Sequence, residues 1–297
     1  MDFIFVKKLI VPFVILIAII FGYFLFNAPK NFPAGEIVNI NEGVSLRFLS
    51  KDLEIKNIIK SRVAFETFVI MYGGEKHIAP GYYLFENKVS VFEVARRIVK
   101  GDRHLAPIKI TIPEGYSISD IADTVAVKLP NFNKDKFLLE TKNKINKEGY
   151  LFPDTYFFFV PSTEEDVINT MSDNFENKIK TLKNEIATSG KSEKDIINMA
   201  SIIEKEAKGD MDRGLISGIL WKRVNKNMLL QVDAESSTYK IKGLPINPIC
   251  NPGLDSIKSA IHPVNSDYLY YLHDKNGVAH YAKTFAEHKL NIQKYLK

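Results

Sequence analysis

The sequence predicts an α+β protein that begins with a single apolar, membrane-spanning segment. Three observations lead to this prediction. Short strand-like runs alternate with amphipathic helices in the first half of the chain. A long helical stretch follows from about Glu164 to Ala187, and the dipeptide Asn276-Gly277 between alternating residues indicates a β-hairpin near the C-terminus. We therefore expect small α/β modules followed by a mixed helix-and-hairpin domain.

Length and composition set broad limits. The 297 residues suit two domains, and 45% apolar with 25% charged residues is ordinary for a globular protein. The net charge of +5 is mildly basic, but no basic stripe interleaved with aromatic residues occurs, so no nucleic-acid partner is expected. The single cysteine, Cys250, excludes an intramolecular disulfide and a cysteine-rich metal site.

The N-terminal segment Leu9–Phe26 contains 18 uncharged, almost wholly apolar residues, just enough to cross a bilayer core. Lys7 and Lys8 precede it and Lys30 follows, so the positive-inside rule predicts a cytoplasmic N-terminus and an external main domain. A cleaved signal peptide is the alternative, but Ala28 has phenylalanine rather than a small residue at the −3 position. We expect a retained anchor.

An internal repeat follows the anchor. The run Ile40–Leu46, INEGVSL, matches Ile112–Ile118, IPEGYSI, at an offset of 72 residues. Each copy reads as a strand, a Glu-Gly turn and a helix whose N-cap is Ser45 or Ser117. Chance similarity of two strand–turn–helix units is the alternative.

Between and after these copies, local signals mark further elements. A strand with turn chemistry at Pro80-Gly81 precedes an amphipathic helix that ends at Gly101, and residues 107–112 alternate as a strand. Six aromatic residues fall within Tyr150–Phe159.

The second half is predicted to be mostly helical. Ser192 and Asp195 form a capping box for a helix that Gly209 should end, and Asp210 should cap the next helix. A short helix is predicted over 257–263. Thr284, with Glu287 three residues on, should cap the final helix after the hairpin.

The helix around residues 196–207 carries two carboxylates on its apolar side. At about 100° per residue, Glu204 falls between Ala200 and Ile197, and Glu206 falls between Ile202 and Met199. An apolar setting favours the protonated form of a carboxyl group, which is the form a general acid needs. A structural glutamate paired with Lys205, Lys208 or Arg213 is the alternative.

Several kinds of chemistry lack a motif. The six histidines form no H-E-x-x-H and no helical i, i+4 pair, so a catalytic zinc is not expected. Neither G-x-S-x-G, a P-loop nor G-x-G-x-x-G occurs. We therefore expect neither a metal nor a cofactor.

Five blocks occur in one order from about Glu148 to Lys297, and together they carry a family resemblance. They are EGYLFPDTYFF, MASIIEKEA, LLQVDAESSTY, GLPINPICNPGLDSIKSAIHP and YLYYLHDKNGVAHYAKTFAEHKLNIQKYL. In these blocks the sequence resembles the MltG (YceG-like) membrane-anchored endolytic murein transglycosylases. These are lyases that cleave the MurNAc–GlcNAc β-1,4 bond inside a glycan strand.

The resemblance implies a role for Glu204, which matches the catalytic acid/base of that family. Glu204 would protonate the leaving glycosidic oxygen and then, as a carboxylate, deprotonate the C6 hydroxyl of MurNAc. A 1,6-anhydro ring closes without water. Because the substrate supplies the nucleophile, the second carboxylate of ordinary glycosidases is dispensable.

The same blocks imply substrate contacts. The candidates are Glu148, Tyr150, Tyr156, Gln231, Asp233, Asn251 and His280. A packed aromatic core around Tyr150 and Tyr156 is an equal alternative, and His280 fits a structural role as well. Ala234 and Glu235 stand where the family usually has Pro-Thr. This difference weakens the assignment of family roles to the neighbouring Gln231 and Asp233. Glu206 and His262 are assigned to structure, Glu206 with Arg213 or Arg223 as partner.

The resemblance also implies an organisation and a location. We expect a cytoplasmic tail at 1–8, an anchor at 9–26, a linker at 27–39, LysM-like modules at 40–145 and a catalytic domain at 146–297. The protein would be a single-pass protein of the inner (cytoplasmic) membrane, with its catalytic domain outside. It would act on nascent peptidoglycan beside penicillin-binding proteins and terminate glycan elongation.

Two other classes of function are weighed against this one. A non-catalytic peptidoglycan-binding scaffold would keep the fold without needing Glu204. A pyridoxal-phosphate lyase, a label relatives have carried, would need a phosphate cup that the sequence lacks.

Overall fold

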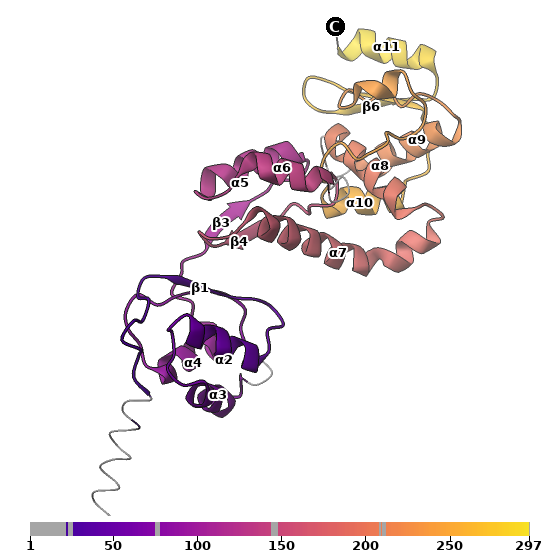
Figure 1. Ribbon diagram of the computed structural model, residues 1–297. Coiled ribbons are helices and arrows are strands. Elements are labelled where there is room, and N and C mark those ends of the chain that lie inside the picture. The colour runs from indigo at the N-terminus through magenta and orange to yellow at the C-terminus, as the bar shows by residue number, and fades with distance from the viewer. Residues whose placement is uncertain are drawn as a thin grey trace, which may run out of the picture. The chain divides into compact units, whose positions relative to one another are not determined.

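A computed structural model of the chain describes residue 22 and residues 26–74, 78–143, 148–207, 209 and 212–296. The chain divides into two compact units, Met1–Ala106 and Pro107–Lys297 (Figure 1). Each unit mixes helices with a few short strands, which confirms the α+β class. The two units are described separately below.

The first unit pairs two short strands and packs helices beside them. Its elements are β1 (Ile37–Ile40), α2 (Leu46–Ile55), α3 (Arg62–Met71), β2 (Gly81–Leu84) and α4 (Val91–Lys100). The strands are antiparallel, with Ile37 opposite Leu84. The core is formed by residues such as Leu53, Phe65, Tyr83 and Ile98. Gly101 ends α4 in the left-handed conformation at φ 69°, as predicted.

The second unit begins with the same order of elements. These are β3 (Ile108–Thr111), α5 (Ile118–Lys128), α6 (Lys134–Asn143) and β4 (Thr155–Phe158), and the strands again pair antiparallel. Ser45 caps α2 and Ser117 caps α5 through their hydroxyl oxygens, so both predicted caps are confirmed. The internal repeat is thus a strand–helix–helix–strand unit that occurs once in each half of the structure.

This second copy explains why the observed division differs from the predicted boundary at 145/146. The strand β3 has its partner β4 beyond that boundary, with Ile108 opposite Phe158. The core of the second copy also includes residues that follow the boundary, such as Leu151 and Met171. The described residues from 107 to 143 therefore belong to the same unit as the C-terminal half of the chain.

The long helix α7 (Glu164–Thr188) extends from the β3–β4 strands to α10 (Figure 1), and it contributes residues to two hydrophobic clusters of the second unit. Val167, Ile168 and Met171 pack with the β3–β4 repeat. Phe175 and the residues one and two turns later pack into a second cluster formed with α8, α9 and α10. Its 25 residues, close to the predicted extent, carry a single apolar stripe at helical spacing.

The second cluster is built on α8 (Glu193–Glu206), α9 (Arg213–Asn225) and α10 (Leu254–Ile261). The Ser192 hydroxyl accepts from the backbone N–H of Asp195, which confirms this cap. The predicted stop at Gly209 is wrong, because α8 ends at Glu206 and Ala207 is already extended. The predicted cap Asp210 lies outside the described residues.

A hairpin and a final helix complete the unit: β5 (Tyr270–His273), β6 (Ala279–Ala282) and α11 (Phe285–Tyr295). The turn forms where predicted, with Gly277 at φ 82° and the Asp274 carboxylate accepting from the Asn276 and Val278 amides. Thr284 caps α11 as predicted. The Tyr281 hydroxyl donates to Asp212 at the start of α9, which ties the hairpin to the helical cluster.

Within the described residues, no helix combines the length and apolar composition needed to cross a membrane. The predicted anchor at 9–26 lies, except for residues 22 and 26, outside those residues.

We expect Gly218→Ala to destabilise the second unit by ~2–4 kcal/mol. A Cβ at Gly218 would lie 1.9 Å from the carbonyl oxygen of Val264. The backbone of Val264 cannot easily move away from α9, because the Val264 N–H donates to the Gly214 carbonyl at 2.9 Å. Urea unfolding measures the effect.

The neighbouring Ser217→Ala variant is the control. Ser217 is fully buried, and its hydroxyl has no hydrogen-bond partner among the described residues, so its removal should leave stability unchanged or raise it. Equal stability of both variants would contradict the close approach of Val264 to α9.

Candidate active site

One polar stripe of α8 holds the loop that follows η2 (Ser236–Tyr239). Asn198 donates its amide to the Pro245 carbonyl, Ser201 accepts from the Ile249 N–H, and Glu204 accepts from the Gly253 N–H. Spacing of three residues places these side chains along one side of the helix. The loop therefore covers the polar side of α8, and Asn198 and Ser201 are buried.

Glu204 lies at the end of this stripe. One carboxylate oxygen, Oε2, accepts from Gly253 N at 2.9 Å, and the other, Oε1, lies 3.9 Å from the Arg213 guanidinium. The side chain is only 7% exposed. Arg213 was one of the partners proposed for a structural glutamate. The carboxylate therefore has a polar neighbour at each oxygen, although Ile197, Ala200 and Ile203 of the same helix lie in the hydrophobic cluster.

The loop 245–253 is fixed from its other side by Asn251, which is fully buried. Its carbonyl oxygen accepts from the N–H groups of Gly149 and Leu151 at 3.0 and 2.9 Å. Its NH₂ group donates to the Tyr116 carbonyl and to Glu148. Since every hydrogen-bonding group of this amide is used inside the protein, Asn251 positions the site rather than contacting substrate, contrary to the sequence-based expectation.

Glu148 is held beside Asn251. Its carboxylate accepts from the Ile118 N–H at 3.1 and 3.2 Å and from the Asn251 amide at 3.1 Å. Burial raises the pKa of Glu148 to about 7, against the hydrogen bond from Ile118 that acts in the opposite direction. This carboxyl group therefore keeps its proton to a higher pH than an exposed glutamate does.

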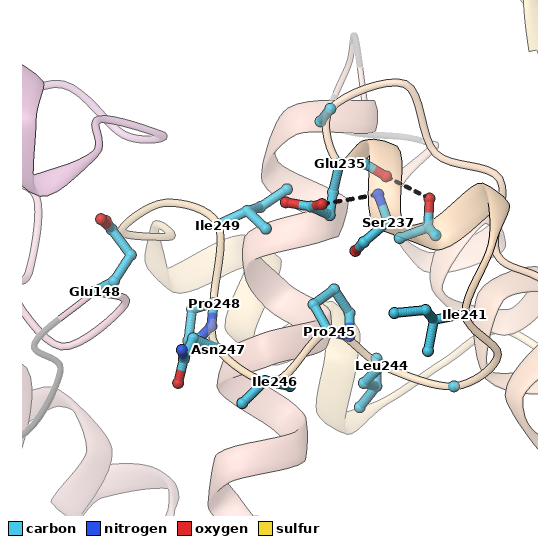
Figure 2. Close-up of a pocket in the computed structure, with 13 residues that line it drawn as sticks. Glu148, Glu235, Ser237, Ile241, Leu244, Pro245, Ile246, Asn247, Pro248 and Ile249 are labelled. Carbon is cyan, nitrogen blue, oxygen red and sulfur yellow. Dashed lines mark hydrogen bonds between the residues drawn. The ribbon is translucent and has the colours of Figure 1, made fainter.

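Glu148 also lines a pocket of about 540 Å³, which we call the loop pocket. In Figure 2, Glu148 lies at one side of the loop through Pro248 and Ile249, and Glu235 with Ser237 lies at the other. The Glu235 carboxylate accepts from the Ser237 N–H at 2.9 Å. The pocket combines carboxylates and a hydroxyl with apolar walls, a surface suited to a sugar.

A second pocket of about 740 Å³, the hairpin pocket, lies against β5 and α11. It contains Gln231 and Asp233, two of the predicted substrate contacts, together with aromatic side chains from the hairpin. Gln231 has an unusual backbone φ of 52°, and Asp233 accepts from the Tyr239 hydroxyl. Ala234 lines both pockets.

Glu206 lines the hairpin pocket and accepts from the Tyr271 hydroxyl at 2.9 Å. Burial raises its pKa, and the hydrogen bond from Tyr271 offsets part of that shift. The partner of Glu206 is thus a tyrosine, whereas Arg213 approaches Glu204. The Arg223 guanidinium donates to the carbonyls of Leu269 and Leu230.

Three of the predicted substrate contacts pack against or bond to other residues of the protein. Tyr156 is 6% exposed, its hydroxyl donates to the Phe152 carbonyl, and burial raises its pKa to about 12. Tyr150 is half-buried and packs on Phe175 with ring centroids 5.1 Å apart. His280 is stacked on Tyr295 and bonded to Asp274 at 3.0 Å. The core alternative fits Tyr156, and the structural alternative fits His280.

One residue close to Glu204 was not predicted as a site residue. Glu114, in the Glu-Gly turn before α5, lies with its carboxyl group against Gly253. The only signal in the sequence is the place of Glu114 in the internal repeat. A glutamate in a turn has no helical or strand periodicity, and this one lies far in the sequence from the MASIIEKEA block that holds Glu204.

The raised pKa of Glu148 predicts a pH dependence of stability. An unfolded glutamate titrates near 4.5, whereas folded Glu148 titrates near 7. Between these two pH values Glu148 carries a proton in the folded state but not in the unfolded state. The stabilisation that this proton gives to the folded state is fully present below about pH 4.5 and is lost as pH rises through 7. The free energy of unfolding of the parent protein should fall by on the order of 1–3 kcal/mol between pH 5 and pH 8. The Glu148→Gln variant should not show this fall.

Urea unfolding of both proteins at the two pH values measures this effect. Because glutamine keeps the shape and one acceptor oxygen, the variant should fold. An unchanged difference between pH 5 and pH 8 in the variant would contradict the assignment.

Comparison with known proteins places this site in context. The sequence model of the YceG-like family matches residues 38–237 and 235–294. An endolytic murein transglycosylase of Bacillus subtilis is 30% identical, and the alignment covers 87% of this chain and 84% of that protein. One from Streptococcus pneumoniae is 25% identical over 98% of this chain and 66% of the relative's length.

A solved structure agrees. The crystal structure of a YceG-like protein from Listeria monocytogenes matches with a TM-score of 0.56 at 28% identity, covering 86% of this chain and 99% of that one. The family model and the named relatives therefore place the chain in the class of the endolytic murein transglycosylases. The chain belongs to the YceG-like family.

Proposed function

We propose that this protein is an endolytic murein transglycosylase, a lyase that cleaves MurNAc–GlcNAc β-1,4 bonds within glycan strands. Glu204 donates its proton to the glycosidic oxygen as the bond between that oxygen and C1 of MurNAc breaks. The C6 oxygen of the same MurNAc then bonds to C1, and its proton passes to the Glu204 carboxylate. The acid is regenerated, a 1,6-anhydro ring forms, and no water is consumed.

The observation that carries this proposal is the setting of Glu204. A single carboxylate with 7% exposure is oriented by the Gly253 N–H and lies near the Arg213 guanidinium. Fixed orientation by backbone is what a group needs in order to donate and then accept a proton at neighbouring atoms of one sugar. The named relatives supply the substrate class, murein.

For substrate contacts we propose the two pockets that adjoin at Ala234. Glu148 in the loop pocket and Gln231 with Asp233 in the hairpin pocket offer polar groups to hydroxyl and N-acetyl groups. Tyr150 remains a candidate for stacking on a sugar face, since it is half-buried.

We further propose that the chain is anchored in the inner membrane by residues 9–26, with both folded units outside. The support is the apolar run and its flanking lysines. The two strand–helix–helix–strand copies are proposed to be LysM-like modules that contact peptidoglycan. An enzyme held at the membrane reaches newly made strands, which fits termination of elongation beside penicillin-binding proteins.

The experiment uses the full chain with nascent, uncrosslinked glycan strands. An endolytic enzyme shortens the mean strand length early, before disaccharides accumulate, and every new end carries 1,6-anhydro-MurNAc by mass spectrometry. Binding of the strands without cleavage would overturn the proposal and favour the non-catalytic scaffold. Release of disaccharides from the ends alone would overturn its endolytic part.

A further inference from the structure

The Glu-Gly turn that occurs in both copies of the repeat has different surroundings in each. In the first copy, a Cβ on Gly43 would find nothing within 4 Å among the described residues. In the second, a Cβ on Gly115 would lie 3.4 Å from Cγ of Glu204. Both glycines have the left-handed backbone, at φ 72° and 78°. The same local motif therefore borders the proposed catalytic acid in one copy only.

The second turn is fastened to the loop that orients Glu204. The Gly115 N–H donates to the Asn251 carbonyl and the Asn251 N–H donates to the Tyr116 carbonyl, each at 2.9 Å. The Glu114 carboxyl group lies so close to Gly253 that a Cβ there would be 1.9 Å from its Oε1. Gly253 is thus in contact with two glutamates, Glu114 at its Cα and Glu204 at its N–H.

These contacts limit the distance between the two carboxyl groups. With standard backbone geometry, their nearest oxygens are no more than roughly 7.5 Å apart. Carboxyl pairs at such distances serve on the two sides of a glycosidic bond in other enzymes. Glu114 is exposed whereas Glu204 is nearly covered, so Glu114 is the one that meets a ligand from solvent.

Glycosidic cleavage builds positive charge at the anomeric carbon and ring oxygen in the transition state. In the proposed reaction Glu204 transfers the proton, and the guanidinium of Arg213 lies beside it. A permanent negative charge near the ring would stabilise the transition state more than the ground state. Glu114 is the exposed carboxylate placed to supply that charge.

We propose that Glu114 is a second catalytic carboxylate, which faces the sugar at the cleaved bond and stabilises its developing positive charge. The inference rests on the proposed transglycosylase function. Proton transfer and ring closure stay with Glu204, and Glu114 forms no covalent bond.

The test compares Glu114→Gln with Glu176→Gln, an exposed glutamate of α7 outside both copies and both pockets, in the full chain. Glutamine keeps the shape of Glu114 and removes its charge. We expect kcat on glycan strands to fall about 10²-fold for Glu114→Gln with KM within about twofold, and no change for Glu176→Gln. The thermal unfolding midpoint should be unchanged in both.

A charge-specific readout separates this role from a structural one. A cationic iminosugar that resembles the charged ring should bind Glu114→Gln at least about tenfold more weakly, while an uncharged N-acetylated disaccharide should bind both proteins alike. An equal loss of binding affinity for both ligands, or a kcat of Glu114→Gln within about twofold of the parent protein, would overturn the proposal for Glu114. The proposed function itself would not be affected by either result. Absence of cleavage by the parent protein would overturn the proposed function itself.

Discussion

Replacing Glu204 with glutamine will abolish glycan cleavage, with a fall in kcat of at least about 10³-fold. Glutamine fills the same space and can still accept from the Gly253 N–H, so the loop 245–253 keeps its anchor. What it lacks is a proton to donate to the leaving oxygen and a base to take the proton of the C6 hydroxyl. Both halves of the reaction fail together, whereas binding of the strand is retained.

The measurement is the rate of new 1,6-anhydro ends, with far-UV circular dichroism and thermal unfolding to show that the variant folds. Glu193→Gln, in the first turn of the same helix, is the matched control and should keep full activity. Undiminished cleavage by a folded Glu204→Gln variant would remove Glu204 from the mechanism and direct attention to Glu148, the carboxyl group whose pKa burial raises to about 7.

Replacing Asn251 with alanine will have the largest effect on stability, about 3–5 kcal/mol, together with a loss of activity. Its buried amide serves four groups: the amides of Gly149 and Leu151, the Tyr116 carbonyl and the Glu148 carboxylate. The alanine variant leaves these groups unsatisfied in a buried place. It also frees the loop that orients Glu204, so activity falls even at temperatures where the protein remains folded.

Urea unfolding and cleavage rate are measured on the same preparation, with the exposed Asn265→Ala as control. The Asn251→Asp variant gives a further check. It keeps both acceptor bonds but sets a second carboxyl group against Glu148, so its stability should recover at acidic pH, where Glu148 is protonated. A change below about 1 kcal/mol for Asn251→Ala would contradict the role of this amide.

Local features of the fold could be predicted from the sequence because their causes are local. A serine or threonine before a helix satisfies backbone N–H groups nearby, and the caps at Ser45, Ser117 and Thr284 form as expected. The Asn276-Gly277 turn is equally local, because Gly277 at φ 82° needs no tertiary support. The predicted end of α8 was wrong, because a glycine allows a helix to end but does not determine the residue at which it ends, and α8 already ends at Glu206.

The domain division and much of the site depend on contacts between distant segments. The pairing of β3 with β4 joins residues on both sides of the predicted boundary, and no local signal announces a partner so far along the chain. Asn251 is predicted as a substrate contact because its Asn-Pro-Gly loop could present backbone donors to N-acetyl groups. Only its bonds to residues more than 100 positions away reveal a positioning role.

Glu204 shows how far each kind of reasoning reaches. Helical periodicity placed it on an apolar arc and left its role open, while the order of the surrounding blocks singled it out. The structure adds what neither could supply, the Gly253 N–H and the Arg213 guanidinium at its two oxygens. Glu114 could be identified only from the fold, since its turn and α8 lie far apart in the sequence. They come together where Gly115 lies against Glu204 and where Glu114 and Glu204 both contact Gly253.

Cleavage in water enriched in oxygen-18 tests the central claim most directly. If the C6 hydroxyl of MurNAc is the nucleophile, mass spectrometry of the products will show anhydro ends that contain no heavy oxygen, and Glu204→Gln will form none. One heavy oxygen at each new reducing end would show that water attacks the anomeric carbon. That result would make the protein a hydrolase and contradict the account given for Glu204.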